Sequence, residues 1–331
     1  MRILVTGSAG HLGEALMRTL EHSGHEALGL DIKSSPFTHR VGPITERSVV
    51  KQCMRRVDAV LHTATLHKPH LASHSHQDFV DTNITGTLLL LEEAAEAGIK
   101  AFVYTSTTSA FGRALTPPVG APAAWITEEV VPVPKNIYGV TKLAAENLCE
   151  LFHHKNGLAC IILRTSRFFP EEDDDKAARE TYDDANLKVN EFLYRRADIE
   201  DVVSAHLLAM QKAPRLGFGR FIVSATTPFT PYDLQALRGN ASAIVKRYVP
   251  CYEAEYRRRG WSMAPAIDRV YVNELARARL GWQPRYDFGG IIQRLRASDD
   301  FRSPLAIAVG SKGYHRESFA EGPYPVGERR G

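Results

Sequence analysis

The amino-acid sequence predicts an α/β fold in which a doubly wound parallel sheet is followed by a smaller C-terminal substrate domain. Over the first 165 residues, short apolar runs rich in β-branched residues alternate with amphipathic stretches of helical period. Continuous apolar strands that alternate with such helices are typical of a parallel sheet covered on both faces. The chain of 331 residues is also long enough for one large domain and one small one.

This alternation gives an ordered set of predicted elements. We expect strands at Ile3–Thr6, Glu26–Leu30, Ala59–His62, Ala101–Thr105 and Ala159–Leu163. We expect helices between them at Leu12–Leu20, Val49–Arg56, Phe79–Ala97 and Tyr138–His153. Strands separated by helices of this length indicate repeated strand–helix units and therefore parallel pairing.

Two segments interrupt the rhythm. Arg113–Ile137 contains five prolines and is predicted to be a long surface loop. Glu171–Asp175 reads EEDDD and has no core-forming pattern, so we expect a solvated loop that faces away from the cleft. If it faced the cleft instead, its carboxylates would repel a diphosphate.

The second half of the chain is patterned more weakly. We expect a helix at Asp201–Met210, a strand at Arg220–Ala225 and a helix at Asn273–Leu280 capped by Asn273. The predicted division places the sheet domain in residues 1–170, to which residues 195–225 return. Residues 171–331 form the smaller substrate domain and a tail, in which residues 301–331 dock or remain mobile.

Composition and charge exclude several classes of partner. The net charge of +3 gives no argument for nucleic acid or an anionic membrane. No apolar run approaches the roughly 20 residues that span a bilayer, and MRILVTG at the start is strand-like rather than leader-like. The four cysteines form no CxxC pair, so we expect a reduced, cytoplasmic protein.

The first strand leads into TGSAGHLGEAL, a glycine-rich turn before a helix. Gly7, Gly10 and Gly13 are spaced three apart, and small residues let the backbone approach a pyrophosphate at the helix N-terminus. The pattern is a variant of the dinucleotide fingerprint. Its alternative reading is a tight packing turn without a ligand.

An acid stands where a Rossmann-type fold binds ribose. Asp31 ends the second predicted strand, 18 residues after Gly13. A carboxylate there accepts hydrogen bonds from ribose hydroxyls and repels a 2′-phosphate, so NAD is favoured over NADP as the cofactor. Lys33 nearby weakens that preference.

Two residues are spaced for proton transfer. Tyr138 and Lys142 are four apart on a predicted helix and therefore share one face. A Lys⁺ beside a phenol favours the phenolate and lowers the pKa of tyrosine, which makes Tyr138 a base near neutral pH. An exposed helical pair without a role is the other reading of this spacing.

Taken together, the motifs resemble the extended short-chain dehydrogenase/reductase superfamily. They are TGSAGHLG, Asp31, DAVLHTAT, NITGT, FVYTSTTSAFG and YGVTK, in that order. The chain is most similar to the NAD-dependent epimerase/dehydratase family, which includes UDP-glucose 4-epimerase. The resemblance covers residues 1 to about 165 well and continues loosely through RRADIEDVVSAHLLA and ARARLGWQPRYDF.

The resemblance implies roles for individual residues. Thr107 matches the family's hydroxyl residue that binds the reacting oxygen, and Thr108 is the substitute for it. Tyr138 matches the family's base, and Lys142 matches the lysine that holds the nicotinamide ribose. Asn83 matches an asparagine that supports the site, although a turn asparagine is the alternative. The implied NAD-binding residues are Gly7, Gly10, His11, Leu12, Gly13, Asp31, Ile44, Thr63, Ala64, Asn83, Thr105, Tyr138 and Lys142.

Departures from the family pattern narrow the reaction. Thr107 is followed by Thr108 and Ser109. The family's dehydratases and decarboxylases carry an acidic residue at this point, and elimination needs such an acid. The resemblance therefore disfavours both activities for this chain. Arg167 replaces the asparagine of nucleotide-sugar epimerases and is predicted to bind a phosphate or carboxylate of the substrate.

The leading interpretation is an epimerase of a sugar or nucleotide sugar that works by transient hydride transfer to tightly bound NAD. The alternatives are an NAD-dependent dehydrogenase or reductase of a sugar, lactone or hydroxy acid, and a non-catalytic NAD-binding protein. The resemblance also implies a homodimer that pairs the helices at Phe79–Ala97 and Tyr138–His153.

The segment HTATLHKPHLASHSH, residues 62–76, holds five of the thirteen histidines. It follows the strand Ala59–His62, on the side where parallel sheets bind ligands. We expect His67 to face the substrate. Two alternatives remain: a metal site that the histidines form with the EEDDD loop, and histidines that are simply solvated. Only His70 and His74 have the spacing of metal ligands on a helix. The hydride mechanism needs no metal, so none is assigned.

Overall fold

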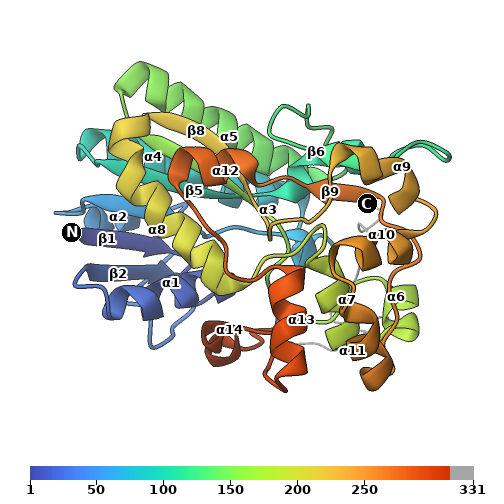
Figure 1. Cartoon of the computed structure of the whole chain (residues 1–331). Helices are drawn as coiled ribbons and strands as arrows, with labels where there is room; N and C mark the ends of the chain where they lie inside the picture. Colours follow the sequence, from blue (N-terminus) through green and yellow to red (C-terminus); the bar gives the residue numbers. More distant parts are fainter. Residues whose placement is uncertain (314–331) are drawn as a thin grey trace.

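The computed structural model describes residues 1–313, and its centre is a seven-stranded parallel sheet (Figure 1). The strand order is β3-β2-β1-β4-β5-β7-β8. The strands are β1 Arg2–Thr6, β2 Glu26–Asp31, β3 Arg40–Val41, β4 Ala59–His62, β5 Ala101–Thr107, β7 Cys160–Thr165 and β8 Phe218–Val223. This order reverses direction at β1, as in a doubly wound dinucleotide-binding sheet, so the predicted fold class is confirmed.

Helices cover both faces of the sheet because successive strand residues point to opposite sides. Ile3 and Val5 pack in one core with α1 (His11–Glu21) and α8 (Ile199–Leu216). Leu4 lies in the core on the other face. The helices that contribute to this second core are α2 (Arg47–Cys53), α4 (Gly86–Glu96) and α5 (Ile137–Asn156). Because both faces of the sheet are buried, the central strands are continuous runs of apolar residues.

A third core lies in the second half of the chain, beyond the carboxyl ends of the strands (Figure 1). It is built by α7 (Asp184–Glu191), α9 (Leu234–Leu237), α10 (Ala241–Tyr248), α11 (Tyr252–Arg259) and α13 (Phe288–Arg296). A small parallel pair joins β6 (Ala124–Ile126) to β9 (Arg269–Tyr271) beside it. The remaining helices are α3 (His76–Phe79), α6 (Lys176–Thr181), α12 (Glu274–Leu280) and α14 (Pro304–Val309). The domain boundary at residue 170 stays a prediction.

Most predicted elements are found within a few residues of their expected ends. The predicted strand Arg220–Ala225 is β8, the last strand of the sheet, and the predicted helix Asp201–Met210 is the middle of α8. The prediction of a continuous loop at Arg113–Ile137 is wrong, because β6 lies within it. No helix in residues 1–313 is long and apolar enough to cross a membrane.

Asn273 is the N-cap residue of α12, as expected, but its side chain makes no capping hydrogen bond. Its amide instead donates to the carbonyl oxygen of Ser224 and to Oγ1 of Thr226, at 2.9 and 3.0 Å. The side chain therefore ties α12 to the end of β8, a long-range role that the capping pattern does not reveal.

Candidate active site

Gly7 and Gly13 of the glycine-rich turn leave no room for a side chain. A Cβ added to Gly13 would lie 1.9 Å from the carbonyl oxygen of Gly7, and one added to Gly10 would lie 3.3 Å from the same atom. Gly7 itself has φ +74°, a conformation that L side chains rarely adopt. The turn is thus a bare backbone cradle at the N-terminus of α1, where a diphosphate is stabilised by amide groups and the helix dipole.

Asp31 stands beside this cradle at the end of β2. Its Oδ2 accepts a 3.0 Å hydrogen bond from the amide of Ala9, and its Oδ1 accepts one of 2.8 Å from the amide of Lys33. A carboxylate oxygen can accept more than one hydrogen bond, so both remain able to bind hydroxyls. The cradle and this acid together fit the adenosine diphosphate part of NAD.

The other expected cofactor residues lie around the same edge of the sheet. Thr63 and Ala64 follow β4, and a Cβ on Gly7 would lie 2.7 Å from the amide nitrogen of Ala64. Ile44 packs against Gly86 and is buried. The Leu12 side chain is in the core, so only its backbone is placed to contact a cofactor.

Asn83 supports the loop after β4. It lies in a π-helical turn, Val80–Thr85, and its amide donates to the carbonyl oxygen of Leu66 and to Oγ1 of Thr141 at 2.9 and 3.0 Å. Its Oδ1 accepts from the amide of Leu66 at 2.8 Å. The side chain therefore joins this loop to the helix that carries Tyr138, which agrees with a supporting role.

Thr107, Tyr138 and Lys142 come together at the carboxyl end of β5. Tyr138 and Lys142 lie on α5 with 8% and 2% of their surface exposed, and Tyr138 is hydrogen-bonded to Thr107. Lys142 donates from Nζ to the carbonyl oxygen of Thr105 at 2.6 Å. Thr108 points elsewhere, toward the carbonyl oxygen of Thr165 at 3.4 Å, so Thr107 is the better placed of the two hydroxyls.

The pKa values of this pair differ from the sequence expectation. Burial raises the pKa of Tyr138 to about 12, and the hydrogen bond with Thr107 offsets only part of this effect. Burial also lowers the pKa of Lys142 to about 7. The expected lowering of the tyrosine pKa by a neighbouring Lys⁺ is therefore wrong for this structure, because desolvation disfavours the charged form of both groups.

A buried acid lies one further turn along α5. Glu146 accepts from Ser106 Oγ at 2.5 Å and from Nη2 of Arg164 at 2.7 Å, and all three residues are buried. The carboxylate acts against the loss of charge on Lys142, since it raises the pKa of that lysine. No sequence motif singles out Glu146, although its spacing of four from Lys142 places it on the same helical face.

Arg167 does not lie free in the cleft. Its guanidinium forms ion pairs with Asp173, Asp174 and Glu191, the last two at 2.9 and 3.2 Å. The expectation that the EEDDD run is solvated and faces away is wrong, because Asp173 and Asp174 are buried. Neutralisation by the neighbouring cations makes their burial tolerable.

The rest of the acidic run joins separate parts of the chain. Lys68, in the loop after β4, forms an ion pair with Asp174. Glu171 lies 2.8 Å from Nε2 of His11, the first residue of α1, and accepts a 3.0 Å hydrogen bond from the amide of Lys312. The run thus connects three segments that surround the cofactor edge of the sheet.

In the histidine-rich loop, neighbouring imidazole rings contact one another. The rings of His67 and His70 lie 4.8 Å apart, and those of His70 and His74 lie 5.0 Å apart. Between His67 and His74, the helical residues are those of the short 3-10 turn Lys68–His70. Within residues 1–313, no group of three or more His, Cys, Asp or Glu side chains is placed to hold a metal ion.

Comparison with known proteins agrees with this geometry. Residues 3–220 match the model of the NAD dependent epimerase/dehydratase family. A 166-residue stretch is 33% identical to the uncharacterized protein y4nG of Sinorhizobium fredii and covers 49% of this chain and 39% of that protein. A UDP-glucose 4-epimerase of Lactobacillus helveticus is 24% identical, with 87% of this chain and 93% of that protein covered.

A solved structure supports the fold. A short-chain dehydrogenase/reductase superfamily protein from Agrobacterium tumefaciens, crystallised with bound NAD, superposes with a TM-score of 0.63 at 21% identity. The superposition covers 90% of this chain and 98% of that one. Since the family model spans well over half of the chain, this protein belongs to the NAD dependent epimerase/dehydratase family.

Proposed function

We propose that this protein is an NAD-dependent epimerase of a sugar or nucleotide sugar. The observation that carries the proposal is the buried group of Thr107, Tyr138 and Lys142 on the same sheet edge as the glycine cradle. The UDP-glucose 4-epimerase from Lactobacillus helveticus, matched over 93% of its length, supports the same activity.

The side chains divide the proton chemistry between them. NAD, when bound, supplies a hydride acceptor and donor beside the substrate carbinol. Tyr138 Oη, as phenolate, takes the proton of the substrate hydroxyl, and it returns that proton when the resulting carbonyl is reduced from its other face. Thr107 Oγ1 holds the reacting oxygen, and Lys142 provides the positive charge that stabilises the phenolate.

The first experiment measures cofactor content and epimerisation together. Purified protein is expected to carry NAD(H), seen by mass spectrometry, and to interconvert two epimers from a panel of UDP-sugars and free sugars without added cofactor. The Tyr138→Phe variant is expected to keep its NAD and lose activity by roughly 10²–10⁴-fold. Absence of epimers across the panel contradicts the proposal, and stoichiometric accumulation of NADH with one substrate indicates a dehydrogenase instead.

We also propose a homodimer that pairs α4 and α5 with the same helices of a second copy. On α5, Val140 and Leu151 are 49% and 43% exposed, unusual for large apolar side chains. They are three helical turns apart and therefore lie on one face, as a self-complementary interface requires. Sedimentation of the wild type and of Val140→Glu tests this proposal. The cytoplasmic location stays a prediction.

A further inference from the structure

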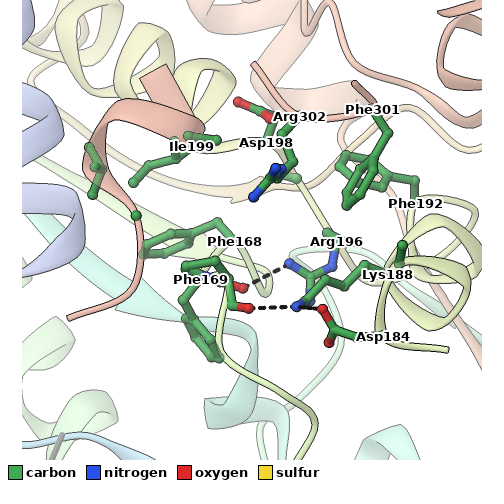
Figure 2. Close-up of a pocket in the computed structure, with 16 residues that line it drawn as sticks. Phe168, Phe169, Asp184, Lys188, Phe192, Arg196, Asp198, Ile199, Phe301 and Arg302 are labelled. Carbon is green, nitrogen blue, oxygen red and sulfur yellow. Dashed lines mark hydrogen bonds and ion pairs between the residues drawn. The ribbon is translucent and has the colours of Figure 1, made fainter. Parts of the chain in front are cut away.

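A cavity of about 260 Å³ lies outside the catalytic group (Figure 2). Its lining comes from Phe168–Pro170, from α7, from Arg196–Ile199 and from Phe301 to Gly310 around α14. None of Thr107, Tyr138 and Lys142 lines it. The cavity therefore represents space that the proposed epimerase reaction does not use.

Most of the wall is aromatic or aliphatic. Figure 2 shows Phe168 and Ile199 on one side of the cavity and Phe192 and Phe301 on the other. Apolar side chains on α14 complete the wall, namely Ala306 and Val309. A concave apolar surface with a few polar groups is the usual form of a small-molecule site, and this volume lies just below the usual range for drug-sized ligands.

One polar group of the wall has unused hydrogen-bonding capacity. Arg196 is 4% exposed; its Nε donates to Glu191 at 2.7 Å and its Nη1 donates to the carbonyl oxygen of Phe169 at 3.1 Å. Its Nη2 has no acceptor among the residues that the structure describes. Since Arg196 lines the cavity, this nitrogen is available to donate a hydrogen bond to a ligand that enters it.

The other charged groups of the wall are already paired. Lys188 donates to the carbonyl oxygen of Pro170 and to Asp184. Asp198 accepts from the amides of Glu200 and Ser303 at 2.8 and 3.0 Å. The charged side chains of the wall are therefore three cations (Lys188, Arg196 and Arg302) and two acids (Asp184 and Asp198), a formal net charge of +1 that suits a singly charged anion.

We propose that this cavity binds a small monocarboxylate with an aromatic or branched apolar body. The carboxylate accepts hydrogen bonds from Nη2 of Arg196, and the apolar body lies between Phe168 and Phe301. Charge-assisted bonds from arginine to carboxylate are among the strongest that a protein makes, and the aromatic wall supplies the hydrophobic contribution. The site is separate from Arg167, whose guanidinium is held by Asp173 and Asp174.

The test uses phenylacetate and benzoate as probes, with phenylacetamide and benzamide as neutral analogues of the same shape. Calorimetric titration of the full chain is expected to show saturable binding of a carboxylate and at least about tenfold weaker binding of its amide. Ala306→Phe fills the cavity and is expected to abolish binding. Ala308→Phe, which makes the same change on the exposed side of α14, is the matched control and is expected to bind normally.

Three results overturn the proposal: no binding of either carboxylate, equal binding of acid and amide, or unchanged binding by Ala306→Phe. Circular dichroism of both α14 variants establishes that they are folded. If Ala306→Phe unfolds, Val309→Trp fills the same cavity from the next turn of the helix and replaces it in the comparison.

Discussion

Lys142 donates a 2.6 Å hydrogen bond from Nζ to the carbonyl oxygen of Thr105, which joins α5 to the end of β5 one helical turn from Tyr138. Burial holds the pKa of this ammonium near 7 and that of the Tyr138 phenol near 12. The pair thus loses its first proton close to neutral pH. The form with a phenolate and an ammonium holds the same number of protons as the form with a phenol and a neutral amine, so both forms have the same pH dependence.

The pH profile of kcat/KM is the first prediction. Because the base form of the pair holds one proton fewer, activity is expected to rise as the pH increases through about 7 and then to level off. Lys142→Met is expected to move this rise toward the pKa of the phenol and to lower activity at pH 7 at least about tenfold. Lys135→Met, at an exposed position just before α5, is the control; matching profiles for the two variants would contradict the assignment.

The glycine cradle gives the second prediction. Gly13→Ala brings a Cβ within 1.9 Å of the carbonyl oxygen of Gly7, so the turn must open and its amides must move. NAD affinity, measured by titration of NADH fluorescence, is expected to fall at least about tenfold. Gly239→Ala is the control, since a Cβ there meets nothing within 4 Å. Equal NAD affinity in both variants would show that the glycine cradle does not bind the cofactor.

The sequence predicts the parts of this structure whose signal is local. Apolar runs such as Ala59–His62 identify the sheet, and the spacing from Gly13 to Asp31 identifies the cofactor edge, because each pattern lies within one strand–helix unit. The pair of β6 and β9 has only three residues in each strand and joins segments far apart in the chain, so no local period indicates it.

In the candidate site, the position of the acidic run Glu171–Asp175 likewise could not be predicted from a local pattern. Five adjacent acids normally lie in water, and only the fold brings Asp174 to Lys68 and Glu171 to His11. The role of Glu146 could not be predicted for a related reason, because most single acidic residues in helices are exposed to solvent. Long-range partners decide burial in both cases, and neither composition nor periodicity contains them.

Asp174 is expected to limit the affinity for nucleotide sugars. It forms ion pairs with Lys68 and with Arg167, so it competes with any diphosphate for both cations. Asp174→Asn frees these charges and is expected to lower the KM for UDP-sugars several-fold, with a smaller effect at high ionic strength. Asp175→Asn keeps the cap of α6 and is exposed, so it should leave KM unchanged. An unchanged KM in Asp174→Asn would place the diphosphate elsewhere.

Glu171 predicts a pH-dependent part of the stability. Burial raises the pKa of this carboxyl, but hydrogen bonds with His11 and with the amide of Lys312 outweigh burial and hold the pKa at about 2. The folded-state value is below the unfolded one, so this stabilisation is complete above about pH 4.5 and is lost as the pH falls through 2. It amounts to at most about 3.5 kcal/mol by the usual conversion of about 1.4 kcal/mol per pKa unit.

Urea unfolding between pH 7 and pH 3 measures this contribution. Glu171→Gln is expected to be less stable than the wild type at pH 7, and the difference should shrink as the pH falls, because the wild type alone loses the ionised carboxylate. Glu172→Gln removes a neighbouring charge from an exposed position and is the matched control, with a difference expected within about 0.5 kcal/mol. A constant difference between Glu171→Gln and the wild type over this range would show that the carboxylate charge does not stabilise the contact between α1 and the segment after α14.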